Sequence, residues 1–262
     1  MNSLALNPPT PAPRASALGA YLTESKFELT RMVRNPGVAI PVLVLPLALY
    51  VLFALLIAGE AVDKDPNTGI FLFSAFSLMS VTMPAMFGIG VTLALERDMG
   101  LLKLKRAQPA PAGSWLVAKI VCGVVFSTLA YLPMLAAALA GGKLPLSGVQ
   151  VAAMSAAMIV GTIPFCALGL MVGSLVKGSA APGYDNLIYL PGCYLSGLFF
   201  PLPQSMHWQT PLWPQFHVGQ LAMHAAGVQK FQFLPASMAA ATLLGFTVLF
   251  SAVAIWRLAR KG

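Results

Sequence analysis

Long apolar runs alternate along the chain with shorter segments that carry most of the charged residues. Six of these runs reach the roughly 20 residues that a helix needs to cross about 30 Å of hydrocarbon. Backbone inside a bilayer must satisfy its own hydrogen bonds, and the runs lack the alternation of a β-strand, so each is predicted to be a helix. The pattern predicts an all-α integral membrane domain over residues 36–262, with spans at 38–59, 70–95, 115–140, 150–175, 184–203 and 236–256.

The fifth run is the least regular, because its sequence PGCYLSGLFFPLP contains proline and glycine. The residues after it, 204–235, are too rich in apolar and aromatic side chains for a free aqueous loop. We predict a re-entrant or interfacial helical segment before the last span. Its aromatic anchors would be Trp208, Trp213, Phe216, Phe231 and Phe233.

Residues 16–35 have a different pattern, with apolar and small side chains at spacings of three and four. This periodicity predicts an amphipathic helix, and Ser16 is a suitable N-cap. Its position before the first span favours a helix in the membrane interface over a soluble helix packed on a partner. Residues 1–15, rich in proline and small side chains, lack a signal-peptide pattern and are predicted to be a disordered cytoplasmic tail.

Composition supports a membrane environment. The chain is 58% hydrophobic and only 9% charged, with a mean hydropathy of +0.78, whereas soluble domains are about 25% charged. A cytoplasmic N-terminus leaves thirteen of the 16 basic residues inside and three outside. By the positive-inside rule, both termini are therefore expected in the cytoplasm. The membrane is expected to be a bacterial inner membrane. The three outside are Lys64, Lys143 and Lys230.

Charged and reactive side chains are scarce in the spans. Lys119 and Asp185 lie near cytoplasmic ends, where we expect them to reach the interface by snorkelling. The lack of a midplane carboxylate or histidine disfavours a proton-driven transporter and a charge-lined channel. The spacing of the histidines matches no metal motif, and the sequence has neither a catalytic constellation nor a phosphate-binding GxxxxGK[ST] loop. The isolated cysteines, Cys122, Cys166 and Cys193, are expected to pack as buried apolar residues.

Two local sequence patterns suggest contacts, one between helices of the chain and one at the charged segment 93–115. Gly169 and Gly173 form a GxxxG element, which allows close helix packing. The charged segment LALERDMGLLKLKRAQPAPAGSW, residues 93–115, places leucines between basic residues at helical spacing. The positive-inside rule explains the basic residues and would also fit a solvated loop, but it does not explain the leucines or the Pro turn.

The chain resembles the permease subunits of type-2 (ABC-2) ABC exporters. Three stretches carry the resemblance: LTRMVRNPGVAIPVLVLPL, ALERDMGLLKLKRAQPAPAGSWLVAKI and YLSGLFFPLPQSMHWQTPLWPQFH. The middle stretch is the most specific, with its Glu-Arg pair, Gly, Leu-rich basic helix, Pro turn and Lys119 at the start of the third span. Gln108 departs from the Thr or Ser that is common before the Pro.

The resemblance implies a coupling helix in the 93–115 loop that docks on a separate ATPase subunit, with Glu96 and Arg97 paired at the membrane boundary. The coupling residues would be Glu96, Arg97, Gly100, Leu101, Leu102, Leu104 and Pro109, with the three leucines as apolar anchors. Residues 16–35 would form a connecting helix that carries Glu24, Glu28, Arg31 and Arg34. Two permeases, expected as a homodimer, and two ATPases would form the working unit, with ATP and Mg²⁺ on the ATPases and no cofactor on this chain.

We therefore expect a transport subunit and not an enzyme: the permease of an ATP-driven exporter of a drug, a peptide or a lipid-linked glycan. There are two alternatives: a membrane protein of assembly or signalling that transports nothing, and, less favoured, a Na⁺-coupled carrier. Partners would include membrane lipids but no nucleic acid. Aromatic side chains could line a translocation path or simply pack; these are Phe76, Phe87, Tyr189, Tyr194 and Phe199.

Overall fold

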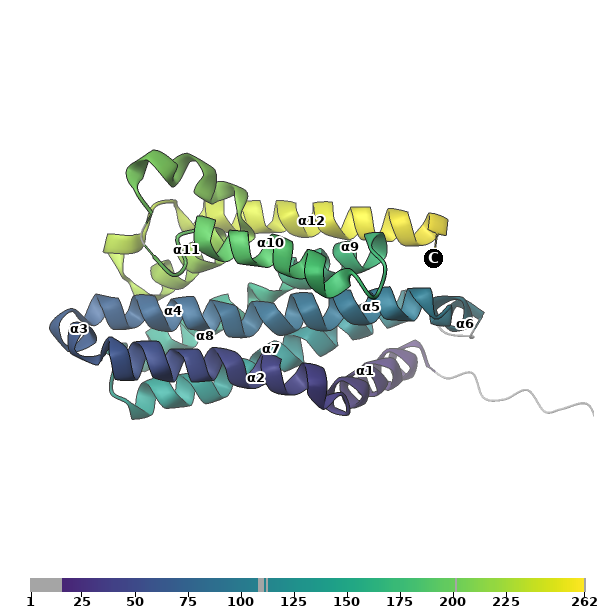
Figure 1. Ribbon diagram of the computed structural model, residues 1–262, viewed down its shortest axis with the longest axis horizontal. Coiled ribbons are helices and arrows are strands. Elements are labelled where there is room, and N and C mark those ends of the chain that lie inside the picture. Colours follow the sequence, from purple (N-terminus) through teal and green to yellow (C-terminus); the bar gives the residue numbers. More distant parts are fainter. Residues whose placement is uncertain (1–15, 108–110, 112, 201, 262) are drawn as a thin grey trace, which may run out of the picture.

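The computed structural model describes residues 16–107, 111, 113–200 and 202–261, all of whose regular elements are helices (Figure 1). The predicted tail 1–15, Gln108 and Pro109 lie outside the described residues. The elements are α1 Ala17–Val33, α2 Pro36–Tyr50, the π-helix η1 Val51–Ile57, α3 Gly59–Lys64, α4 Pro66–Met83, the π-helix η2 Pro84–Gly88, α5 Ile89–Asp98, α6 Leu101–Ala107, α7 Ser114–Ala140, α8 Gly148–Val160, α9 Thr162–Leu175, α10 Ala181–Leu195, the 3₁₀ helix η3 Gln204–Leu212, α11 Pro214–Ala226, the 3₁₀ helix η4 Gln229–Phe231 and α12 Ala236–Lys261.

Five helical stretches of the described chain are long and apolar enough to cross a membrane, which confirms five of the six predicted spans by length and composition. Some of them join consecutive elements, since α4, η2 and α5 form one stretch and α8 and α9 form another. The stretches are Ala39–Ile57, Pro66–Asp98, Ser114–Ala140, Gly148–Leu175 and Ala236–Arg260.

The helix in the fifth predicted span, α10, is shorter than expected. It has 15 residues, which reach about 22 Å at 1.5 Å per residue, less than the roughly 30 Å of a hydrocarbon core. The chain turns directly after it, at Gly197, whose φ of 73° is favourable only for glycine. The predicted extent 184–203 is therefore wrong at both ends.

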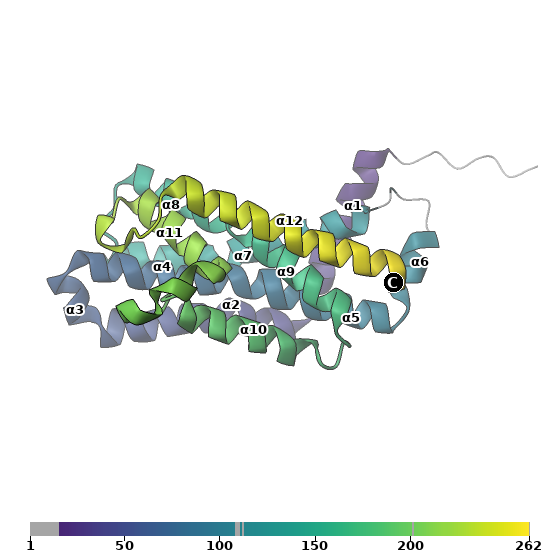
Figure 2. The same ribbon diagram turned by 90° about the horizontal axis from the view of Figure 1, so that it is seen from above.

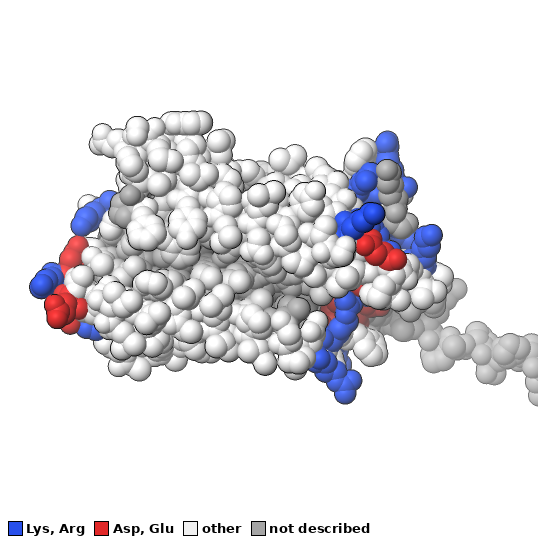
Figure 3. Space-filling model, in the orientation of Figure 1, with Lys and Arg blue, Asp and Glu red and all other residues white. Residues whose placement is uncertain are grey.

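The long helices lie side by side along the molecule, whereas α1 lies across one end of them (Figures 1 and 2). We call this end, which also holds α6 and the end of α12, the α1 end, and the opposite one, at α3, the α3 end. Charged side chains gather at the two ends, and the visible surface between them has none (Figure 3). A band without charge between two charged ends is the pattern expected of a membrane-spanning bundle.

Glycines bring η2 and α5 into close contact with α9, as the GxxxG element predicts. A Cβ on Gly173 would lie 2.4 Å from the carbonyl oxygen of Gly90, and one on Gly169 would lie 2.6 Å from that of Met86. Nearby, Pro84 begins the π-helix η2 between α4 and α5, because proline lacks the N–H that a regular helix needs there. The three cysteines are buried and free, as expected.

The segment before the last long helix is helical, as predicted, and well packed. The α11 helix contacts α8, α12 and α4 and buries most of its side chains. Each of the three histidines places a ring Nε2 within hydrogen-bond distance of a backbone carbonyl: His207 with Leu202, His217 with Pro211 and His224 with Leu234. These contacts hold the turns of the segment, and no group of potential metal ligands occurs among the described residues.

Candidate functional site

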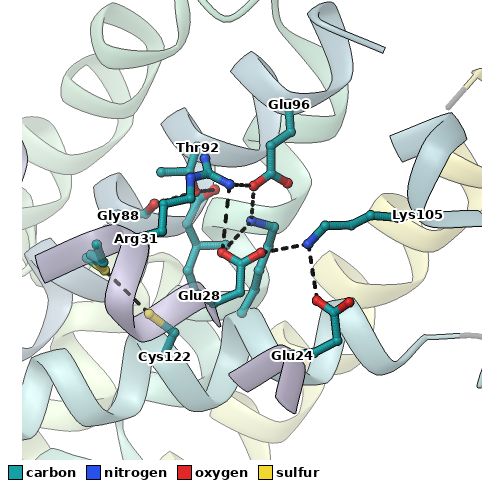
Figure 4. Close-up of polar contacts among 11 residues, drawn as sticks. Glu24, Glu28, Arg31, Gly88, Thr92, Glu96, Lys105 and Cys122 are labelled. Atoms are coloured by element: carbon teal, nitrogen blue, oxygen red, sulfur yellow. Dashed lines mark hydrogen bonds and ion pairs between the residues drawn. The ribbon is translucent and has the colours of Figure 1, made fainter. Parts of the chain in front are cut away.

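A cluster of ion pairs joins four helices at the α1 end (Figure 4). Lys119 of α7 is at its centre, with Nζ 3.0 Å from Oε1 of Glu96 on α5 and 3.2 Å from Oε2 of Glu28 on α1. Arg31, one turn after Glu28 on α1, also pairs with Glu96. Lys105 of α6 completes the cluster, with Nζ 2.8 Å from Oε1 of Glu28.

The central members of this cluster are buried. Glu96 is 0% exposed and Lys119 is 1% exposed, so the prediction that Lys119 reaches the interface by snorkelling is wrong. A buried ammonium group needs compensating charge, and carboxylates from two other helices supply it. Asp185 on α10 is also buried, because its carboxylate occupies the space that the missing side chain of Gly90 leaves on α5.

The cluster lowers the pKa of Glu28, a carboxylate on α1. Burial by itself raises its pKa, but the positive charges of Lys119, Lys105 and Arg31 outweigh burial and hold the pKa below the ordinary value of 4.5. Glu28 is therefore ionised at neutral pH. The side of α1 that faces the bundle thus combines the carboxylate of Glu28 with the buried Met32, while Leu18 and Leu22 are exposed.

The remaining predicted residues of α1 divide into two groups. Glu24 takes part in the cluster, since Lys105 Nζ lies 3.4 Å from its Oε2. Arg34 is exposed at the C-cap of α1. Three of the four predicted residues of the connecting helix thus contact the cluster: Glu24, Glu28 and Arg31.

Arg97 fastens the end of α5 to the end of α9. Its guanidinium donates to the carbonyl oxygens of Ser174 at 2.5 Å and Val176 at 2.6 Å, which lie where a helix leaves its last carbonyls without partners. The next residue, Asp98, accepts a hydrogen bond from the backbone N–H of Gly178 at 2.7 Å. Glu96 and Arg97 therefore do not pair with each other as predicted, because Glu96 faces Arg31 and Lys119 while Arg97 reaches Asp98 and the end of α9.

Two further contacts attach α6 to the rest of the bundle. Arg106 donates from Nη2 to the carbonyl oxygen of Leu258 on α12, at 2.7 Å. Leu102 is 1% exposed and belongs to the main apolar core. The prediction that Leu102 is an anchor for a partner is therefore wrong, since its side chain anchors α6 to its own bundle.

The other side of α6 is open. Leu104 is 65% exposed and Leu101 is 36% exposed, and Met99 just before the helix is also exposed. Gly100, with a φ of 73°, makes the turn between α5 and α6 that directs these side chains outward. Exposed apolar side chains beside the exposed Lys103 form a surface suited to a protein partner.

The aromatic residues predicted as a path form two groups. Phe76, Phe199 and Tyr194 follow one another, with ring centroids 5.8 Å and 5.9 Å apart. Phe87 and Tyr189 form a separate edge-to-face pair at 5.5 Å, and the Tyr189 hydroxyl is hydrogen-bonded to Thr82. Tyr189 and Phe76 are buried, whereas Tyr194 is exposed. Most of this set therefore packs in the core.

Sequence reasoning identified the α1 end but missed Lys105, Arg106 and Asp98 as contact residues. One signal was available: a chain with so few charges is expected to pair those that it buries. The partners could not be assigned, because Glu28 and Lys119 lie far apart in the sequence. These contacts join α6 directly to α1 and α12, and the cluster and Arg97 extend the connection from α1 and α5 to α7 and α9.

Comparisons with known proteins agree with this architecture. The chain matches a family model described as "ABC-2 type transporter" over residues 20–225, from within α1 to within α11. A protein of Bacillus subtilis (strain 168) named "Putative transport permease YvfS" is 24% identical to it over 199 residues, which make up 75% of this chain and 81% of the relative.

Proposed function

Because the chain belongs to the ABC-2 type transporter family, we propose that it is the membrane subunit of an ATP-driven exporter. A separate ATPase subunit would bind ATP and Mg²⁺ and would dock on α6. The working unit would contain two ATPases and two permeases, the second permease being another copy of this chain.

The observation that carries this proposal is the two-sided character of α6. One side is bound to the bundle through Leu102, Lys105 and Arg106, while Leu101 and Leu104 remain exposed for a partner. A nucleotide can drive transport only if the ATPase binds two permease conformations with different affinity. A short helix docked on the ATPase and tied to several long helices would provide such a link.

The membrane arrangement follows from the same proposal. The α10 helix and the turn after it would make a sixth crossing, and the α1 end, which holds most of the basic residues, would face the cytoplasm of a bacterial cell. The long helices carry few charges, which suits an amphipathic or hydrophobic cargo such as a drug, a peptide or a lipid-linked glycan.

The test is transport in proteoliposomes that contain this chain and an ABC ATPase that co-purifies with it. We expect Leu101→Asp and Leu104→Asp, combined, to reduce ATP-dependent efflux at least tenfold, because charges in an apolar contact weaken docking. Val149→Asp is the matched control, since Val149 is exposed in the first turn of α8 and lies near the α3 end. Efflux that is equal in all three proteins would contradict the docking role of α6.

A further inference from the structure

A cavity of about 540 Å³ lies near the α3 end, away from the ion-pair cluster. Its walls come from α4, residues 196–198 and 202–211, α11 and residues 230–234. Its volume is in the range of sites that hold small ligands, about 300–1,000 Å³. Most of the lining is apolar and includes Phe71, Phe216 and Met223.

Gln220 gives part of this cavity a fixed wall. Its side-chain Nε2 donates to the carbonyl oxygen of Phe231 at 3.0 Å, and its Oε1 accepts from the backbone N–H groups of Phe233 at 2.7 Å and Leu234 at 3.3 Å. Three hydrogen bonds from one buried amide hold the 231–234 turn against α11. The cavity is therefore preformed, which lowers the free-energy cost of ordering on binding.

Gln215 supplies a polar group that this wall does not use. The residue lines the cavity and is 1% exposed, and its Oε1 has no hydrogen-bond partner among the described residues. Gly192 on α10 makes room for this amide, since a Cβ there would lie 2.4 Å from Nε2 of Gln215. A buried acceptor without a donor is costly, so a donor from a ligand would be favourable at this position.

The charges around the cavity select the kind of donor. Among the described lining residues, Lys230 is the one that carries a formal charge. Its ammonium lies 3.2 Å from Oδ2 of Asp65, and its side chain is largely exposed. His207, another lining residue, has its Nε2 2.9 Å from the carbonyl oxygen of Leu202. The interior thus has no carboxylate to compensate a cationic donor, which favours an uncharged hydroxyl or amide.

We infer that this cavity is a binding site for an uncharged amphiphile, whose apolar body lies against Phe71, Phe216 and Met223 and whose hydroxyl or amide donates to Gln215. Binding requires neither ATP nor a second subunit. Only the identification of such a ligand with the exported cargo rests on the proposed function.

The test uses the full chain in lipid nanodiscs and two photoreactive probes, decan-1-ol and 1-methoxydecane, each with a terminal diazirine. The alcohol can donate to Gln215 and the ether cannot. We expect the alcohol to label cavity residues with about threefold to tenfold higher apparent affinity than the ether, the range of one neutral hydrogen bond. Gln215→Leu should reduce the affinity of the alcohol to that of the ether.

A second variant tests the location. Gly219 on α11 lines the cavity, and a Cβ there meets nothing within 4 Å, so Gly219→Leu should fill the space without a clash and reduce labelling by both probes at least tenfold. The control is Gly245→Leu on α12, where a Cβ also has open space but which does not line the cavity. Equal affinity of the two probes in the native chain, or labelling that Gly219→Leu leaves unchanged, would overturn the site. Neither result would bear on ATP-dependent efflux, which is measured separately.

Discussion

Lys119 connects helices that are distant in the sequence. Its ammonium lies between Glu28 of α1 and Glu96 of α5, and the latter carboxylate is fully buried. Removal of one partner from a buried ion pair leaves an uncompensated charge, which costs more than the pair itself contributes. Removing one charged residue of the cluster should therefore destabilise the fold more than replacing all of its charged residues by apolar ones.

We predict that Lys119→Met lowers the free energy of unfolding by about 1.5–3 kcal/mol, the range of a hydrogen bond to a charged group, because Glu28 and Glu96 lose one cation but keep Lys105 and Arg31. Thermal unfolding in detergent measures the effect. Lys26→Met is the matched control, since Lys26 is exposed on α1, and it should change stability little. Equal shifts for the two variants would contradict the central role of Lys119.

Glu28 should make stability depend on acid pH. Its folded-state pKa is below the ordinary value of 4.5, so its contribution is present above that value and is lost as the pH falls through the lowered, folded-state pKa. Unfolding of the native chain and of Glu28→Gln, measured from pH 7 to pH 3, should show a stability difference that is constant above about pH 4.5 and shrinks below it. Glu60→Gln, at an exposed position near the α3 end, should follow the native profile.

Sequence patterns identified charged residues at the α1 end but not their partners. Leucines at helical spacing in residues 101–104 indicated a helix, yet the pattern could not assign Leu102 to the core and Leu104 to the surface. That division depends on which neighbours cover α6. The same holds for Glu96, which turns toward Arg31 and Lys119 instead of toward its neighbour Arg97.

At the scale of elements, the contact of α5 with α9 depends on small residues. Lipid provides little hydrophobic drive for helix association, so close packing of backbones carries much of the contact. Gly90, Gly169 and Gly173 allow that approach, and Arg97 then binds the end of α9. The two helices are expected to move together as one body.

We predict that Gly173→Ala loosens this pair and lowers the free energy of unfolding by about 1–3 kcal/mol, because its Cβ would overlap the Gly90 carbonyl oxygen. Gly183→Ala on α10 is the control, since a Cβ there meets nothing within 4 Å, and its stability should be unchanged or slightly higher. Unfolding in detergent distinguishes the two. If Gly173→Ala leaves the free energy of unfolding unchanged, the close contact between α5 and α9 does not contribute to stability as predicted.

Hydropathy predicted most of the elements because long lipid-exposed helices need long apolar sequences. It failed at α10, where an apolar sequence continues past Leu195 although the helix does not. Gly197 reverses the chain there, and the following residues pack against α4 and α11 to enclose the cavity. The cavity itself depends on this tertiary arrangement, so no periodicity in the sequence could indicate it.

For the whole molecule, the proposed exporter role predicts that transport can be separated from ATP hydrolysis. In the reconstituted complex, Lys105→Met should detach α6 from Glu24 and Glu28 of α1 while leaving Leu101 and Leu104 exposed for docking. The ATPase should still turn over, but cargo moved per ATP should fall about fivefold or more, since coupling free energies are typically about 1–3 kcal/mol. Lys103→Met removes an exposed lysine from the same helix and should preserve the ratio. An equal loss of hydrolysis and transport in Lys105→Met would instead indicate failed docking, and the link through α1 would have to be abandoned.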